Sequence, residues 1–154
     1  MKIEKMKKIV ILFLVFTCNS FSQFKINYKE IQSKYSPLDS EESFIETKSV
    51  NDLEQVLFHF SKKDSTLLSV NFKNIESYSE NEFLNIVNEY IIDYKPSKIK
   101  EWENWTLYYD EKNKIIVVKV FENNLKSKIK DITMINDKRT VESMLKLFEV
   151  KFSH

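Results

Sequence analysis

The clearest hydrophobic pattern in the chain is a helical one that follows residue 79. Ser79 and Glu82 have the spacing of a capping box, in which each side chain bonds to the backbone of the other residue. The apolar residues that follow recur with the 3.6-residue period of one helix face: Phe83, Ile86, Val87, Tyr90, Ile91 and Tyr94. We predict a helix here that ends before Pro96, because a proline disfavours helical backbone in the residue before it.

Two further segments have helical spacing. Ser49 and Asp52 resemble a capping pair, and the apolar residues after Ser49 fit one helix face: Leu53, Val56, Leu57 and Phe60. Asp137 stands before a similar set made of Val141, Met144, Leu145 and Phe148. The pattern therefore predicts a first helix from about Ser49 and a last helix after Asp137.

Between these helices the spacing changes to that of β-strands. Residues 66–72 alternate apolar and polar side chains, as a half-buried strand does. Residues 105–109 and 115–121 are rich in β-formers, and the polar loop between them is suited to a hairpin. Residues 115–118 are apolar on both faces, which indicates a central strand, and residues 129–135 can form a further strand.

These elements predict an α+β domain with the order α-β-α-β-β-β-α from residue 49. Consecutive strands joined by short loops favour a small antiparallel sheet of about four strands, with the helices packed on one face. Residues 23–48 have only a weak pattern and are expected to be a weakly ordered leader. We therefore divide the chain into a segment 1–22, this leader, and a single domain over 49–154.

The first 22 residues have the pattern of a bacterial signal peptide. Four lysines precede the apolar run Ile9–Phe16, which is too short to cross a bilayer, since that needs about 20 residues. Ser20 and Ser22 supply the small residues that signal peptidase requires, which predicts cleavage between Ser22 and Gln23. Met1 and Met6 both remain open as the start. The protein is thus expected to be exported, either to the periplasm or out of the cell.

Cys18 leaves a lipoprotein as the alternative localisation. A cysteine after an apolar run can carry a lipid anchor. However, Thr17 stands before it instead of the usual small Gly, Ala or Ser. We expect Cys18 to be lost with the signal peptide, and membrane attachment only if it is lipidated.

Charge and composition exclude several classes of function. Removing residues 1–22 takes away four Lys and one Glu, so that the net charge of +1 becomes −2. This argues against nucleic acid as a partner, which requires a basic surface. The chain contains no glycine, so phosphate-binding loops, dinucleotide fingerprints and the hydrolase nucleophile elbow are excluded. Its turns must use Asn, Asp, Ser and Lys instead.

No residue pattern predicts a metal, a cofactor or a catalytic site. His59 and the terminal His154 are the only histidines, and we interpret His59 as a surface residue. Ser-x-x-Lys spacings occur four times, the best of them at Ser97, where Pro96 could start a helical turn, but matches to so short a motif arise by chance. The carboxylates Glu101, Glu103, Asp110 and Glu111 flank an aromatic stretch, as in glycoside hydrolases, but are more simply charges at the ends of a hairpin.

Trp102 and Tyr108 are the candidate contact residues for a partner. If Trp105 and Tyr109 face the core, strand alternation turns Tyr108 outward, and Trp102 lies on the approach to this strand. Exposed aromatic rings can bind a sugar, a peptide or another exported protein. The alternative is that both rings pack in the core.

The expected function follows from these exclusions. We predict a non-enzymatic periplasmic or secreted binding module, such as an inhibitor or an immunity-like partner of another exported protein. The alternatives are a small hydrolase that uses carboxylates or a Ser-Lys pair, and a lipid-tethered component of the cell envelope.

Overall fold

A computed structural model describes residues 24–35, 37–41, 44–48, 52–123 and 125–148 of the chain. Within them the elements, in chain order, are α2 (Tyr28–Lys34), β1 (Pro37–Glu41), β2 (Phe44–Lys48), β3 (Glu54–Phe60), β4 (Leu67–Tyr78), α3 (Glu80–Tyr90), β5 (Ser97–Glu101), β6 (Trp105–Asp110), β7 (Ile115–Glu122), β8 (Leu125–Ile135) and α4 (Lys138–Leu147). The predicted cleavage and lipidation residues Cys18, Ser22 and Gln23 lie outside the described residues, as do Ser49 and His154.

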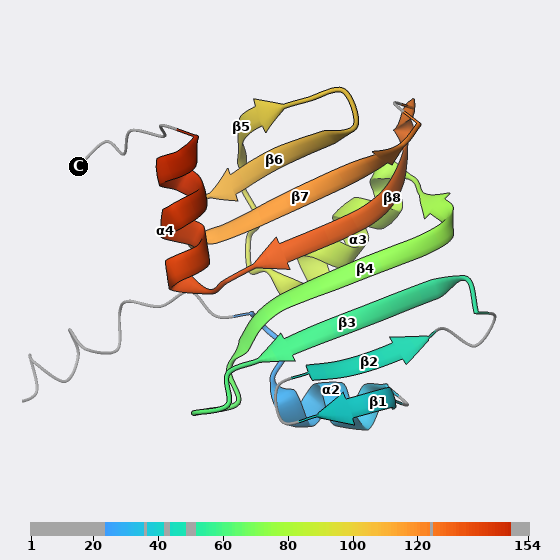
Figure 1. Ribbon diagram of the computed structural model, residues 1–154, viewed down its shortest axis with the longest axis vertical. Coiled ribbons are helices and arrows are strands. Elements are labelled where there is room, and N and C mark those ends of the chain that lie inside the picture. The colour runs from blue at the N-terminus through green and yellow to red at the C-terminus, as the bar shows by residue number, and fades with distance from the viewer. Residues whose placement is uncertain (1–23, 36, 42–43, 49–51, 124, 149–154) are drawn as a thin grey trace, which may run out of the picture.

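The fold class is confirmed as α+β with an antiparallel sheet. All strands belong to one sheet in the order β1-β2-β3-β4-β8-β7-β6-β5, and each pairs antiparallel with its neighbours (Figure 1). The four predicted strands correspond to β4, β6, β7 and β8. The sheet has more strands than predicted. Strand β3 pairs beside β4 and β5 pairs beside β6, and the short strands β2 and β1 follow β3 at that edge of the sheet. No helix in the described ranges is long and apolar enough to cross a membrane.

The helices lie on both faces of the sheet, although a single face was predicted. Ile31 of α2 and Val87 of α3 are fully buried in one core with β3, β4, β7 and β8. Val141 and Leu145 of α4 pack on the opposite side, against Leu107 and Ile116. Figure 1 shows α4 in front of the ends of β6, β7 and β8, with α3 behind the sheet. We call these two sides the core face and the α4 face.

The predicted first helix is wrong, because its residues form strand β3. Val56, Phe58 and Phe60 are buried and alternate with exposed Leu57 and His59, which is the period of a strand. The helix was predicted because Leu57 is apolar although it lies on the outer face of the strand. Together with residues 53, 56 and 60 it produces the spacing of apolar residues on one helix face. The prediction that His59 lies at the surface is confirmed.

The second and last predicted helices are confirmed, together with their caps. Ser79 and Glu82 form the reciprocal capping box at α3, and Asp137 accepts a hydrogen bond from the N–H of Thr140 at α4. Helix α3 ends at Tyr90, earlier than predicted, and Pro96 directly precedes β5. Ser97 therefore begins a strand and not the helical turn that Pro96 could start there.

The turns use the residue types that a chain without glycine has available. The described residues with positive φ are Asp52, Ser65, Ser77, Asp93, Lys114 and Asn123. These are the four residue types predicted for turns. Short polar side chains tolerate the left-handed region because they can bond to nearby backbone.

The element order repeats once along the chain. One helix and four strands (α2, β1 to β4) are followed by another helix and four strands (α3, β5 to β8). If β1 to β4 are exchanged with β5 to β8, each strand for its counterpart, the order of strands in the sheet stays the same. The last strands of the two sets, β4 and β8, pair antiparallel at the centre of the sheet. The two sets are therefore related by an approximate two-fold axis perpendicular to the sheet. Helix α4 alone has no counterpart within the described residues.

Candidate functional site

The predicted contact residues Trp102 and Tyr108 lie on opposite faces of the sheet. Trp102 packs with the cluster under α4, whereas Tyr108 packs against the core of the other face. Both side chains are half-buried. They therefore cannot form one continuous contact surface.

Trp102 is enclosed by its neighbours on the α4 face. Its ring stacks on Trp105 with the centroids 3.4 Å apart, and Phe148 meets it edge-on at 5.3 Å. The ammonium of Lys100 lies 5.6 Å from the ring centroid. The two tryptophans flank the tight turn between β5 and β6, which the N–H of Trp102 closes by donating to the carbonyl of Trp105. This packing stabilises the hairpin and uses the half-buried Trp102 ring in internal contacts.

Tyr108 lies beside a buried lysine, Lys119, that is not among the candidate residues predicted from the sequence. Lys119 is 4% exposed, and its ammonium donates to both carboxylate oxygens of Glu80, at 2.6 and 2.8 Å. The same ammonium lies 3.8 Å from the centroid of Phe83 and 5.1 Å from that of Tyr108. Burial raises the pKa of the Tyr108 hydroxyl. The ion pair of Lys119 with Glu80 thus links strand β7 to the first residue of α3.

The sequence does contain a signal for Lys119. It is the one charged residue within the apolar run 115–121, at a position that alternation places on the same face as Val117 and Phe121. A lysine at a core position requires a carboxylate or an aromatic partner. That partner comes from α3, which is distant in sequence, so only the structure identifies it.

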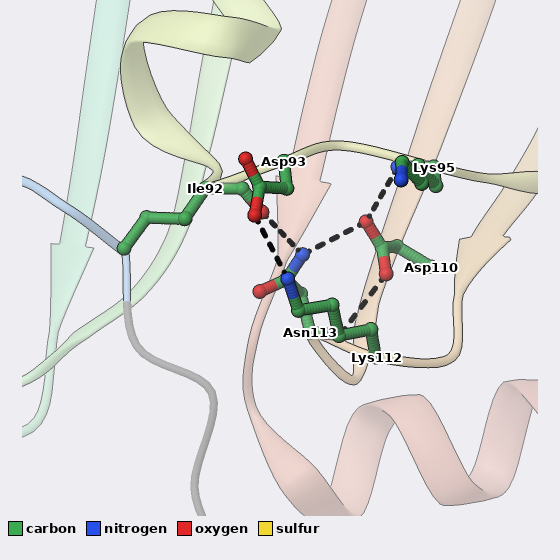
Figure 2. Close-up of polar contacts among 6 residues, drawn as sticks. All are labelled: Ile92, Asp93, Lys95, Asp110, Lys112 and Asn113. Carbon is green, nitrogen blue, oxygen red and sulfur yellow. Dashed lines mark hydrogen bonds and ion pairs between the residues drawn. The ribbon is translucent and has the colours of Figure 1, made fainter.

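Asp110 is a buried carboxylate with a structural role. It is 0% exposed and accepts hydrogen bonds from the N–H of Lys95 at 3.0 Å and from the N–H and side-chain amide of Asn113 at 3.0 and 2.9 Å (Figure 2). Asn113 also donates to the carbonyl of Ile92, and Lys112 pairs with Asp93. These contacts join the hairpin between β6 and β7 to the segment that follows α3.

Glu101, at the other end of the aromatic stretch, does not converge on Asp110. Glu101 bonds to Lys98 and Lys126, whose ammonium groups lower its pKa to about 2. Glu101 pairs with Thr106, four residues from Asp110, which is about 13 Å along a strand. The carboxyl pair of a glycoside hydrolase lies about 5 to 9.5 Å apart. The structure therefore does not bring Glu101 and Asp110 together as such a pair.

Part of the α4 face is not covered by any helix of the described residues and carries accessible polar groups. The packing of α4 involves β5 to β8 and leaves the outer side of β3, β4 and the adjoining part of β8 without a helix (Figure 1). We define this uncovered face by the side chains that point outward from these strands: Gln55, Leu57, Asn71, Lys73, Asp131 and Thr133. All six are half-buried or exposed. The residues that lie between them along the three strands are buried and face the core: Val56, Phe72 and Ile132.

The six side chains form two rows across the strands. Leu57, Asn71 and Thr133 are cross-strand neighbours, and the amide of Asn71 donates to the hydroxyl of Thr133 at 2.7 Å. The second row consists of Gln55, Lys73 and Asp131. Leu57 is 40% exposed, so the face combines an apolar side chain with amide, hydroxyl and charged groups.

A hollow of about 430 Å³ lies at one end of this face, beside the second row. We call it the β3–β4 hollow. Its lining residues are Asp52, Leu53, Gln55, Lys73, Asn74, Ile75, Lys130 and Asp131. Each row and the hollow depend on strand pairing between β3, β4 and β8, which the helical spacing of residues 53–60 conceals in the sequence.

A second hollow, of about 480 Å³, lies where β4 leads into α3. It is lined by three carboxylates, but the side chain of Glu82 caps α3 and the hydroxyl of Tyr78 donates to Glu54 at 2.6 Å. No group of three or more metal-ligating side chains occurs among the described residues. We therefore take the uncovered face as the candidate site.

Comparisons with known proteins do not assign this site. No protein-family model matches the chain, and no curated protein and no solved structure matches it either.

Proposed function

We propose that the protein is an exported, non-enzymatic binding module and that the uncovered face is its contact surface. The observation that carries the proposal is the difference between the two faces of the sheet. The core face is packed with α2 and α3, whereas none of the described helices lies over β3 and β4 on the α4 face.

The chemistry of this face suits a protein or peptide partner. Leu57 offers apolar area on β3, and the neighbouring side chains on β4 and β8 carry amide, hydroxyl and charged groups. Protein interfaces likewise combine apolar and polar side chains. The face carries both a lysine and an aspartate, so it has no strong preference for an anionic polymer.

Site-specific cross-linking tests the proposal. Cys18 is the only cysteine, so a chain with Cys18→Ser can carry one new thiol, either Leu57→Cys on the uncovered face or Leu84→Cys on α3. Both leucines are 40% exposed, which makes Leu84 a matched control. Each thiol is labelled with a photo-cross-linker, and the protein is incubated with cell-envelope extract.

We expect a discrete adduct from position 57 and none from position 84. Equal labelling from both positions, or no adduct from position 57, would contradict a specific contact surface on the uncovered face. Intact-mass analysis of the exported protein tests the localisation separately, because a chain that begins at Gln23 is expected.

A further inference from the structure

The two-fold relation within the sheet gives the β3–β4 hollow a structural counterpart. Helix α4 lies over the start of β7 and the end of β8, where it covers Ile116 and Ile135. Rotation about the axis between β4 and β8 carries this place to the start of β3 and the later part of β4. The β3–β4 hollow is found there, on the same face of the sheet. The hollow therefore occupies the position that α4 fills in the other half.

The chemistry of the two positions differs. The place under α4 is lined by apolar side chains such as Leu107 and Ile116. The β3–β4 hollow instead places Lys73 next to Asp131 in one cross-strand row. Neither of these two side chains forms a hydrogen bond or an ion pair with another described residue. A partner can therefore pair with both charges without breaking a hydrogen bond or an ion pair among the described residues.

The spacing of these charges matches one helix face. Cross-strand neighbours have Cβ atoms about 4.5 to 5.5 Å apart. Residues i and i+4 of a helix are about 5 to 6 Å apart. A Glu and a Lys one turn apart on a helix can thus face Lys73 and Asp131 at the same time.

We propose that the β3–β4 hollow binds one α-helix of a partner protein, which presents an acidic and a basic residue one turn apart. The partner helix takes the place that α4 has in the second half of the molecule, and an apolar residue beside the charged pair contacts Leu57 or the exposed Ile75. This inference rests on the proposed function and specifies the class of partner.

The test uses a displayed library of surface-randomised helical bundles, selected on the full chain. Binders are then measured against Gln55→Trp, which fills the hollow, and Lys73→Glu, which reverses one charge. Asn81→Trp on exposed α3 is the control. Thermal melts of each variant establish that the fold is intact.

We expect binding to weaken about tenfold or more with Gln55→Trp and Lys73→Glu and to be unchanged with Asn81→Trp. Replacing the acidic residue of the binder by Lys should restore affinity for Lys73→Glu. The binder should also suppress the cross-link that the Leu57→Cys variant forms with the envelope protein. Binders that are indifferent to both hollow variants, or that leave the cross-link intact, would overturn the helix assignment.

Two outcomes separate this inference from the proposed function. A cross-link from position 57 that no hollow variant affects would refute the helix in the hollow but keep the binding module. Concentration-dependent dimers of the purified chain that Lys73→Glu abolishes would show that a second copy, and not a partner helix, occupies the hollow. Sedimentation velocity measures this directly.

Discussion

The two halves of the sheet share one order of elements but differ in what lies on their α4 face. In the second half, α4 covers parts of β6 and β7 and the end of β8, and the central strand β7 is apolar on both faces. In the first half, β3 and β4 bury one face only and present Leu57, Asn71 and Lys73 outward. One scaffold thus supports a closed half and an open half, and the open half is where we place the function.

The largest expected effects test whether the halves share one core. Ile31 of α2 and Val87 of α3 are fully buried in the same cluster. We expect Ile31→Asp and Val87→Asp each to cost several kcal/mol of unfolding free energy, because an unpaired carboxylate enters the core. Chemical denaturation should show one cooperative transition in every variant that folds.

Glu89→Ala is the control for the α3 substitution. Glu89 is exposed and pairs with Lys34, so its removal should cost at most about 1 kcal/mol. Two separate unfolding transitions in the unaltered protein would show that the two halves are independent domains and do not share one core.

A second pair of variants compares the covered and uncovered faces directly. Ile116 is fully buried under α4, whereas Leu57 is 40% exposed. We expect Ile116→Ala to cost about 2 to 5 kcal/mol and Leu57→Ala to stay within about 0.5 kcal/mol. Similar losses from both variants, measured by urea titration, would mean that the α4 face of the first half is covered after all.

Removing the N-cap of α4 should destabilise this helix in the closed half. Asp137 accepts a hydrogen bond from the N–H of Thr140 at 2.8 Å and caps α4. We expect Asp137→Ala to cost about 1 kcal/mol and to speed amide hydrogen exchange in α4. Faster exchange in α3 instead of α4 would contradict the assignment of this cap.

The smallest expected effect is a pH dependence of stability that comes from Glu101, on the edge strand β5 of the second half. Lys126 and Lys98 hold the pKa of Glu101 at about 2, below the usual value of about 4.3. Since the folded pKa is lowered, the stabilisation is present above about pH 4.3 and is lost as the pH falls towards 2. Glu101→Gln should remove this part of the pH dependence. A carboxyl NMR titration that gives Glu101 an ordinary pKa would refute the pairing.

The sequence predicts the closed half better than the open half, for a physical reason. Residues 115–118 are apolar throughout because both faces of β7 are covered, so they indicate a central strand without ambiguity. In β3, one exposed leucine between buried residues imitates a helical period. The same leucine belongs to the candidate site, so the residue that obscured the strand is the one that we expect to bind a partner.

Other parts of the structure depend on contacts between distant segments. The caps at Ser79 and Asp137 are local, and the sequence indicates both. The partner of Lys119 lies on α3, 39 residues away, and the row that contains Gln55, Lys73 and Asp131 requires the pairing of three strands. No spacing within one segment can show such a row.

The most direct test of the difference between the halves is a quantitative capture experiment. Leu57→Arg places a charge on the uncovered face, and Leu84→Arg places the same charge on an equally exposed position of α3. We expect Leu57→Arg to reduce capture of the cross-linked envelope protein at least about tenfold, because the loss of one contributing interface contact costs about 1.4 kcal/mol or more. Leu84→Arg should leave capture unchanged, with equal thermal melts for both variants. Equal capture by the two variants would contradict the assignment of the open half as the binding surface.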